Sequence, residues 1–370
     1  MSNKLCLVLS VLFMASLLLA ACAPTSVPAT PTVASDQPTA APATAASEAG
    51  AAAAPTTAAP AQPTTVPAGT YAAPSAERVP LPMTLAEEVQ LAWPAAGQAA
   101  VGSVEDGLLA RLSDTEDLRP TASMAKVITA LALMEKQPFE LGQAGQTYTI
   151  AAEDIADMNA YIAENGIVLP LRIGMELTQY QAMQRMLIAS DNNIADIVVE
   201  RIFGSKEAYV SYAQDMLKRM GVSRTVVADA SGFSPDTAST PSDLLAIGIA
   251  ALNNPVIAEI VAQPQAQMPD IGIITNTNQL LGEDGVIGIK TGTTDEAGYC
   301  LLFAARYVSK DGQERTIVGV IMGDTDATFL FSDSRKLLAS VKQGFGLAEA
   351  QPADNVAAPT PTLRDRAPRP

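Results

Sequence analysis

Ser123 and Lys126 carry a Ser-x-x-Lys spacing that occurs once in this chain. On a helix, residues i and i+3 share one face, so the lysine amine can reach the serine hydroxyl. At a helix N-terminus, free backbone N–H groups and the positive end of the helix dipole favour negative charge on that oxygen. The spacing therefore indicates a nucleophilic serine with a lysine as its base.

The composition excludes the enzyme classes that use histidine for this chemistry. The chain has 370 residues, no histidine and a formal net charge of −16. Without imidazole, Ser-His-Asp hydrolases, Cys-His proteases and histidine-ligated zinc enzymes are excluded, and a partly desolvated lysine becomes the natural base. The negative charge argues against a nucleic-acid partner, which needs a basic surface. No metal ion or cofactor is expected.

Two further polar motifs follow Ser123 along the chain. Ser-Asp-Asn at 190–192 lies between two amphipathic segments, and alone it is typical of a capped turn between helices. Lys-Thr-Gly-Thr at 290–293 follows a predicted strand, where an internal glycine often marks the close approach of a backbone or a ligand. Each motif alone is weak, since on the order of one Ser-x-x-Lys is expected by chance in a chain of this length. The three in this order are far more specific.

The hydrophobic pattern predicts the elements that position these motifs. Helices are predicted at Ser123–Lys136, Thr178–Ile188, Asn193–Phe203, Lys206–Met220, Ser242–Asn253 and Ser332–Gly344, with Thr240 or Ser242 as the N-cap of the fifth. Strands are predicted at Gln98–Ser103, Leu108–Ser113, Val286–Lys290, Tyr299–Tyr307 and Thr316–Met322. Strands at both ends around a helical middle imply that the N- and C-terminal strands share one sheet, in an α+β fold with an inserted helical lobe.

With their flanking residues, the three motifs resemble those of the low-molecular-mass penicillin-binding proteins that are D-alanyl-D-alanine carboxypeptidases. The flanking segments that carry the resemblance are 119–123, 186–192 and 288–299, and the similarity extends from about Gln98 to Phe345. It implies the transpeptidase fold shared by β-lactamases and penicillin-binding proteins. In that fold an antiparallel sheet of N- and C-terminal strands is flanked by helices, and a helical lobe is inserted.

The resemblance implies a catalytic role for each of three residues. Ser123 would attack the carbonyl of the penultimate D-alanine of a peptidoglycan stem peptide and form an acyl-enzyme. Lys126 would be the neutral base that takes the serine proton. Burial and the nearby ammonium of Lys290 are expected to hold the pKa of Lys126 down. Ser190, with Lys290, would pass a proton to the departing D-alanine amine, and water would then release the acyl group.

The resemblance also implies a substrate-binding set. Asn192 would hydrogen-bond the amide backbone of the substrate, and Thr291 with Thr293 would bind its terminal carboxylate. The backbone N–H groups of Ser123 and Thr293 would form the oxyanion hole, where each donor is typically worth about 3 kcal/mol. The full set is Asn192, Lys290, Thr291, Gly292 and Thr293.

Two positions depart from the family pattern. Thr293 stands where many members have a histidine, and because the oxyanion donor there is a backbone N–H, the role is expected to survive. Thr277 stands where some members carry an arginine that binds the substrate carboxylate. Lys290 is then expected to supply most of that positive charge.

Three alternatives to a carboxypeptidase remain open. A class A β-lactamase has the same motifs but needs a glutamate some 35 residues after Ser-Asp-Asn, and 223–232 contains none. The chain could instead be another penicillin-recognising peptidase, an endopeptidase or transpeptidase, or a wall-binding protein that lost turnover.

The expected partners are a stem pentapeptide as substrate and β-lactams as inhibitors, with the protein acting as a monomer.

The N-terminus carries a predicted export signal. One lysine is followed by an apolar run that is short for a membrane span, which needs roughly 20 apolar residues. Leu-Ala-Ala-Cys at 19–22 resembles the lipobox of bacterial lipoproteins, which implies a lipidated Cys22 as the mature N-terminus. The protein would then be exported and anchored at the outer face of the cell membrane, facing the wall.

These signals divide the chain into four expected parts. Residues 1–21 are the lipoprotein signal peptide, and 22–78 form an Ala-, Pro- and Thr-rich tether that cannot bury enough apolar surface to order itself. The catalytic domain spans 79–346. Residues 347–370 form a second disordered, proline-rich tail.

Overall fold

The computed structural model describes residues 83–86 and 89–349. The predicted signal peptide, Cys22 and the tether at 22–78 therefore lie outside the described residues. At the other end, Leu347 is buried and Ala348–Glu349 form a short strand, β12. The ordered chain thus runs three residues into the segment predicted as a disordered tail, because β12 pairs with a strand of the main sheet.

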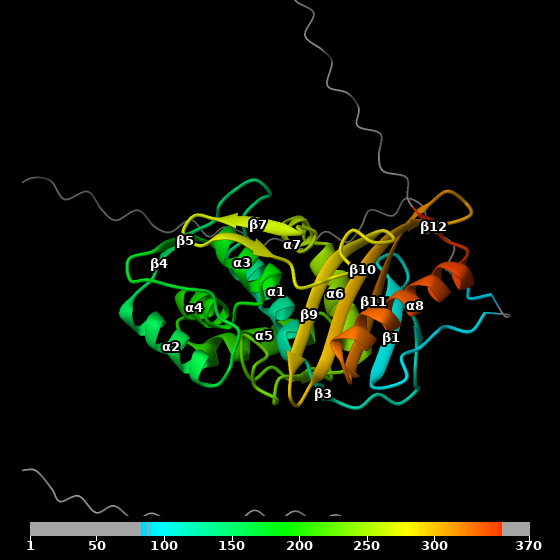
Figure 1. Cartoon of the computed structure of the whole chain (residues 1–370), viewed down its shortest axis with the longest axis horizontal. Coiled ribbons are helices and arrows are strands. Elements are labelled where there is room, and N and C mark those ends of the chain that lie inside the picture. The colour runs from blue at the N-terminus through cyan, green and yellow to red at the C-terminus, as the bar shows by residue number, and fades with distance from the viewer. Residues whose placement is uncertain (1–82, 87–88, 350–370) are drawn as a thin grey trace, which may run out of the picture. The chain divides into compact units, whose positions relative to one another are not determined.

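The main sheet joins the two ends of the described chain. Its strands are β1 (Gln98–Ser103), β2 (Gly107–Arg111), β9 (Val286–Thr294), β10 (Gly298–Val308), β11 (Glu314–Asp324) and β12. The order is β12-β10-β11-β1-β2, with β9 also paired to β10, and every pairing is antiparallel. Figure 1 shows β1 beside β11, with β10 on the other side of β11, which confirms the shared sheet.

Both faces of this sheet are covered, so its central strands are apolar without interruption. Successive side chains of a strand point to opposite faces. In β10, Leu301 and Phe303 pack with α8 (Ala327–Phe345) in one apolar cluster. Leu302 and Ala304 belong to the other cluster, with the helical lobe. This alternation places α8 on one face of β10 and β11 and the helical lobe on the other.

The helical lobe is inserted between β2 and β9. Its helices are α1 (Ala125–Lys136), α2 (Ala152–Ala163), α3 (Gln179–Ile188), α4 (Asn192–Phe203), α5 (Lys206–Arg219), α6 (Pro241–Leu252) and α7 (Pro255–Val261). Every residue of α1 from Ala125 to Met134 is buried, so α1 is the central helix of the fold. Thr240 is the N-cap of α6, which confirms one of the two predicted alternatives.

Several short elements escaped the sequence prediction. The helices are α2, which buries only Asp154, and α7, which has seven residues. The strands form three small antiparallel pairs: β3 (Arg119–Pro120) with β6 (Ala238–Ser239), β4 (Thr147–Thr149) with β5 (Glu176–Thr178), and β7 (Gln265–Met268) with β8 (Gly272–Thr275). Neither a mostly exposed helix nor a two- to four-residue strand carries a clear apolar period.

The described part of the chain contains no single helix long and apolar enough to cross a membrane. Only α6 and α7 together reach that length and apolarity, and they meet at a bend of 105°.

Candidate active site

Ser123 lies in a 3-10 turn, η1 (Ala122–Met124), that runs directly into α1. The helix was predicted to begin at Ser123, whereas the α-helical part begins at Ala125. The preceding residue, Ala122, has φ +46°, a left-handed conformation that costs energy for any residue with a side chain. The sharp turn places the serine at the start of the buried central helix.

The third motif passes directly over this turn. A Cβ placed on Gly292 of β9 would lie 2.9 Å from the carbonyl oxygen of Thr121 and 3.1 Å from the backbone nitrogen of Ser123. Those distances are too short for a side chain. The predicted close approach at this glycine is therefore confirmed, and it brings β9 against the backbone N–H of Ser123.

Lys126 makes three short polar contacts from the interior. Its Nζ lies 2.8 Å from Ser123 Oγ, 2.7 Å from Asn192 Oδ1 and 2.8 Å from the carbonyl oxygen of Ser231. The two latter oxygens can only accept hydrogen bonds. A neutral amine therefore donates its two N–H groups to them and turns its lone pair toward the Ser123 hydroxyl. This is the geometry that a general base requires.

The environment of Lys126 also favours the neutral amine. Burial lowers its pKa to about 7, while Asp229, Asp191 and Asp196 oppose that shift. The expected effect of burial is thus confirmed. The expected contribution of the Lys290 ammonium to the pKa of Lys126 is not found. Instead, burial and the charge of Lys126 lower the pKa of Lys290 well below its ordinary value.

The second motif forms the junction between α3 and α4, as the sequence predicted. Ser190 is buried and has φ +64°. The Lys290 Nζ donates to Ser190 Oγ at 3.0 Å and to the carbonyl oxygen of Thr291 at 2.9 Å. A second serine–lysine pair therefore lies where the helical lobe meets β9.

Asp191, to which the sequence assigned no role, holds this junction in place. Its carboxylate forms an ion pair with Arg185 at 2.8 Å, and both side chains are fully buried. It also accepts the backbone N–H of Leu169 at 3.2 Å. The next residue, Asn192, donates its own backbone N–H to the carbonyl oxygen of Ile167 at 2.8 Å. The motif is thereby tied to the segment that follows α2.

The remaining motif residues alternate along β9. Lys290 and Gly292 are buried, Thr291 is half-buried and Thr293 is exposed. Thr291 Oγ1 lies 2.7 Å from Thr277 Oγ1. The structure thus forms two hydrogen-bonded groups, Ser123–Lys126–Asn192 and Ser190–Lys290–Thr291. They lie close enough for the charge of Lys126 to act on Lys290.

The loop at 229–237 completes the centre, and the sequence reading missed it. Asp229 accepts Ser231 Oγ–H at 2.9 Å, Phe233 N–H at 2.8 Å and Thr237 Oγ1–H at 2.5 Å, which fixes the loop. Gly232 has φ +72°, and a Cβ there would lie 1.9 Å from the carbonyl oxygen of Ala122. Asp-Ala-Ser-Gly at 229–232 is a turn pattern, but nothing in it indicates that a carbonyl oxygen would meet Lys126.

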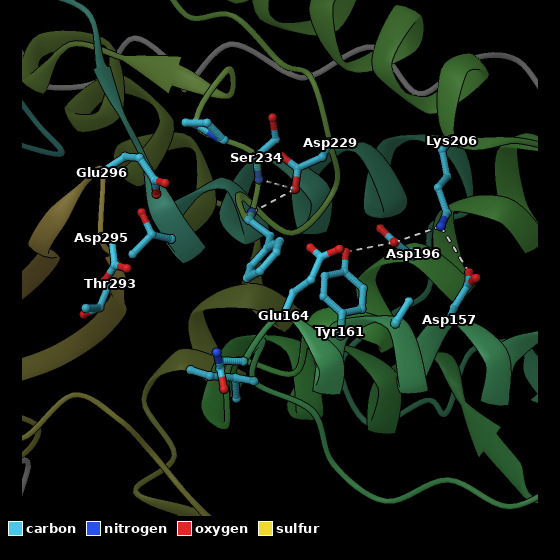
Figure 2. Close-up of a pocket in the computed structure, with 16 residues that line it drawn as sticks. Asp157, Tyr161, Glu164, Asp196, Lys206, Asp229, Ser234, Thr293, Asp295 and Glu296 are labelled. Carbon is cyan, nitrogen blue, oxygen red and sulfur yellow. Dashed lines mark hydrogen bonds and ion pairs between the residues drawn. The ribbon is translucent and has the colours of Figure 1, made fainter. Parts of the chain in front are cut away.

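A cavity of about 860 Å³ adjoins the centre at Thr293 (Figure 2). Asp295 and Glu296 line one side, and Tyr161 and Glu164 of the α2 region line the other. The Tyr161 hydroxyl donates to Asp196 Oδ2 at 2.9 Å and lies 3.2 Å from Ser231 Oγ. Ser123 and Lys126 are not among the lining residues, so the cavity lies beside the centre and does not contain it.

The described residues hold no group of three or more cysteine, aspartate or glutamate side chains placed to bind a metal ion. What the arrangement can do is acyl transfer, with a serine nucleophile, a neutral lysine base and a second serine–lysine pair.

The comparisons with known proteins agree with this geometry. A family model described as D-alanyl-D-alanine carboxypeptidase matches residues 96–326. A D-alanyl-D-alanine carboxypeptidase of Mycobacterium tuberculosis is 30% identical over 230 residues, 60% of this chain and 73% of that protein. A D-alanyl-D-alanine endopeptidase of Pseudomonas aeruginosa is 23% identical over 259 residues, 68% of this chain and 78% of that protein.

Solved structures share the fold. The crystal structure of a D-alanyl-D-alanine carboxypeptidase from Mycobacterium tuberculosis matches with a TM-score of 0.58 at 26% identity, covering 72% of this chain and 96% of that one. The mixed α and β architecture with an antiparallel sheet is the fold that the motifs implied.

Proposed function

This chain belongs to the D-alanyl-D-alanine carboxypeptidase family of serine DD-peptidases, and we propose that it removes the terminal D-alanine from peptidoglycan stem pentapeptides. The observation that carries the proposal is the 2.8 Å contact between Ser123 Oγ and Lys126 Nζ inside a buried centre. Within that centre the lysine pKa is about 7, so a large share of the amine is neutral at neutral pH.

In the acylation step, Ser123 Oγ attacks the carbonyl carbon of the penultimate D-alanine. The serine proton passes to the lone pair of Lys126 as the new C–O bond forms. The backbone N–H groups of Ser123 and Thr293 donate to the developing oxyanion. The close contact of Gly292 with the η1 turn supports this assignment, because it brings β9 against the nucleophile.

Collapse of the tetrahedral intermediate requires a proton on the leaving amine. Ser190 Oγ–H supplies it to the D-alanine nitrogen and takes a proton in turn from Lys290, whose Nζ lies 3.0 Å away. The C–N bond breaks and free D-alanine leaves. The proton that Lys126 took from Ser123 passes to Lys290, which restores both lysines. Water then attacks the acyl-enzyme carbonyl and gives a proton to Lys126, which returns it to Ser123 Oγ as the ester C–O bond breaks.

Substrate binding uses the groups at the edge of the centre. Asn192 Oδ1 is occupied by Lys126, so its amide N–H₂ is the part that donates to the peptide backbone. Lys290, Thr291 and Thr293 receive the terminal carboxylate along β9. β-Lactams, which carry a carboxylate next to a reactive amide, acylate Ser123 in the same way.

A cross-linked peptide is the second candidate substrate. The Pseudomonas aeruginosa relative bears the name endopeptidase and matches 68% of this chain. The cavity beside Thr293 would provide room for a branched ligand. A β-lactamase is disfavoured, because the segment 223–232 contains no glutamate to activate a deacylating water.

The cellular setting is also a proposal, and it rests on the sequence alone. Residues 1–21 act as a signal peptide, and lipidated Cys22 anchors the enzyme at the outer face of the cell membrane. The tether at 22–78 spans the distance to the wall. Metabolic labelling with a fatty-acid probe, lost in Cys22→Ala, would test this anchor.

Two assays test the activity. Incubation with fluorescent penicillin is expected to give a stable adduct that Ser123→Ala abolishes. Rapid release of hydrolysed drug would favour a β-lactamase, and no adduct would favour a wall-binding protein. Release of D-alanine from a stem pentapeptide, compared with cleavage of a cross-linked dimer, then separates carboxypeptidase from endopeptidase.

A further inference from the structure

A short segment, Asn276–Asn278, links the second and third motifs. The Thr277 backbone N–H donates to the carbonyl oxygen of Ile188 at 3.2 Å, two residues before Ser190. Its hydroxyl lies 2.7 Å from that of Thr291 on β9. Thr277 therefore contacts both sides of the centre.

The two asparagines hold this segment rigidly. Asn276 Nδ2 donates to the carbonyl oxygen of Gln263 at 3.0 Å, and its Oδ1 accepts the backbone N–H of Asn278 at 2.9 Å. Asn278 Nδ2 donates to the carbonyl oxygen of Gly288 at 2.9 Å from a buried position. These contacts hold the backbone of Thr277 beside β9.

We propose that Thr277 is a positioning residue that directs the proton of the Thr291 hydroxyl toward the terminal carboxylate of the substrate. It thereby sets the preference for peptides that end in a free carboxylate. This inference rests on the proposed function, in which Thr291 receives that carboxylate.

The reason lies in the proton count of the hydroxyl pair. Each threonine has one O–H, and a carboxylate can only accept. If Thr291 donates to Thr277, its lone pairs face the carboxylate and repel it. If Thr277 donates to Thr291, the Thr291 proton is free for the substrate. Binding of the carboxylate selects the second arrangement.

Lys290 cannot replace this donor. Two of its three N–H groups are directed at Ser190 Oγ and at the carbonyl oxygen of Thr291. At most one remains for a ligand. The direction of the Thr291 proton therefore has a measurable share in carboxylate recognition.

The test uses the full chain and two peptides, a stem pentapeptide with a free C-terminal carboxylate and the same peptide as its C-terminal amide. Thr277→Val is expected to raise KM for the acid about tenfold, the effect of one lost hydrogen bond to a charged group. Its kcat should change less than twofold, and cleavage of the amide should be hardly affected. Thr277→Ser should restore the wild-type KM, since it keeps the hydroxyl.

Two comparisons separate positioning from general damage. Thr275 is an exposed threonine at the end of β8, directly before this segment, and Thr275→Val should match the wild type. In a Thr291→Val background, Thr277→Val should add nothing, because its partner is gone. Equal losses on acid and amide, or an unchanged KM in Thr277→Val, would overturn the inference and leave the proposed function standing. A wild-type enzyme that cleaves neither peptide would overturn both.

Discussion

Two buried serine–lysine pairs lie within the site, and they differ in what surrounds them. The Ser123–Lys126 pair belongs to η1 and α1, where Asp229, Asp191 and Asp196 raise the lysine pKa against the effect of burial, to about 7. The Ser190–Lys290 pair joins the α3–α4 junction to β9, where burial lowers the lysine pKa and the charge of Lys126 adds to that effect instead of opposing it. Similar contacts of 2.8 and 3.0 Å thus give two different acid–base groups.

The difference in the charges around the two lysines fits the separate steps proposed for them. A lysine with a pKa near 7 can take a proton from serine and hold it at neutral pH. A lysine whose ammonium form is disfavoured gives its proton up readily, and it regains charge when a carboxylate arrives beside it. In the proposed mechanism the helical lobe therefore supplies the base, and the boundary with the sheet supplies the acid and the anion-binding group.

The largest expected effect distinguishes the two serines. Ser123→Ala should slow acylation by fluorescent penicillin at least about 10³-fold, because the nucleophile is gone. Ser190→Ala should still form the adduct, although more slowly, because the Ser190 hydroxyl only relays a proton. Equal loss of labelling in both variants, with unfolding curves unchanged, would contradict the division of roles.

The next effect concerns the buried ion pair of Arg185 with Asp191, which holds the α3–α4 junction. Asp191→Ala leaves Arg185 without its partner in the interior and should lower the free energy of unfolding by about 3–5 kcal/mol. The exposed pair of Lys218 with Asp215 provides a matched control, and Asp215→Ala should cost less than about 1 kcal/mol. Urea unfolding of the purified protein measures both. Similar values for the two variants would show that Asp191 does not hold the junction.

The pH dependence tests the source of the Lys126 pKa. The base works only as the neutral amine, so kcat/KM should rise as pH increases through about 7. Asp229→Asn removes the largest of the opposing charges, which lowers the pKa of Lys126 and moves this rise to lower pH. Asp236→Asn, an exposed residue of the same loop, should leave the profile in place. A shift to higher pH in Asp229→Asn would refute the electrostatic account.

The smallest effect is expected at the exposed end of β9. Thr293→Ala keeps the backbone N–H that donates to the oxyanion, and should lower kcat/KM less than about tenfold, well below the loss of an oxyanion donor. Steady-state kinetics on the stem pentapeptide measures this change. A loss of 10²-fold or more would mean that the Thr293 side chain itself takes part in the reaction.

Much of the fold followed from local patterns. The strands β10 and β11 and the helices at 178–188, 206–219 and 241–252 have apolar residues at clear strand or helical spacing, and their ends are close to those predicted. Two elements are longer than predicted: β9 continues through the third motif to Thr294, and α8 begins at Ala327 rather than Ser332. The elements that escaped, α2 and α7 with the short strand pairs, either expose most of their surface or are too short to show a period. Their formation depends on what they pack against.

By itself, the sequence determined the residue types and therefore the chemistry. A chain without histidine but with Ser-x-x-Lys, Ser-Asp-Asn and Lys-Thr-Gly in order leaves a lysine as the base. Only the tertiary structure decided the state of that lysine. Its pKa depends on burial, on carboxylates from α4, the α3–α4 junction and the loop at 229–237, and on the Ser231 carbonyl oxygen that orients its amine. These groups are 65 to 105 residues distant in sequence from Lys126, and desolvation and Coulomb interactions depend on distance in space.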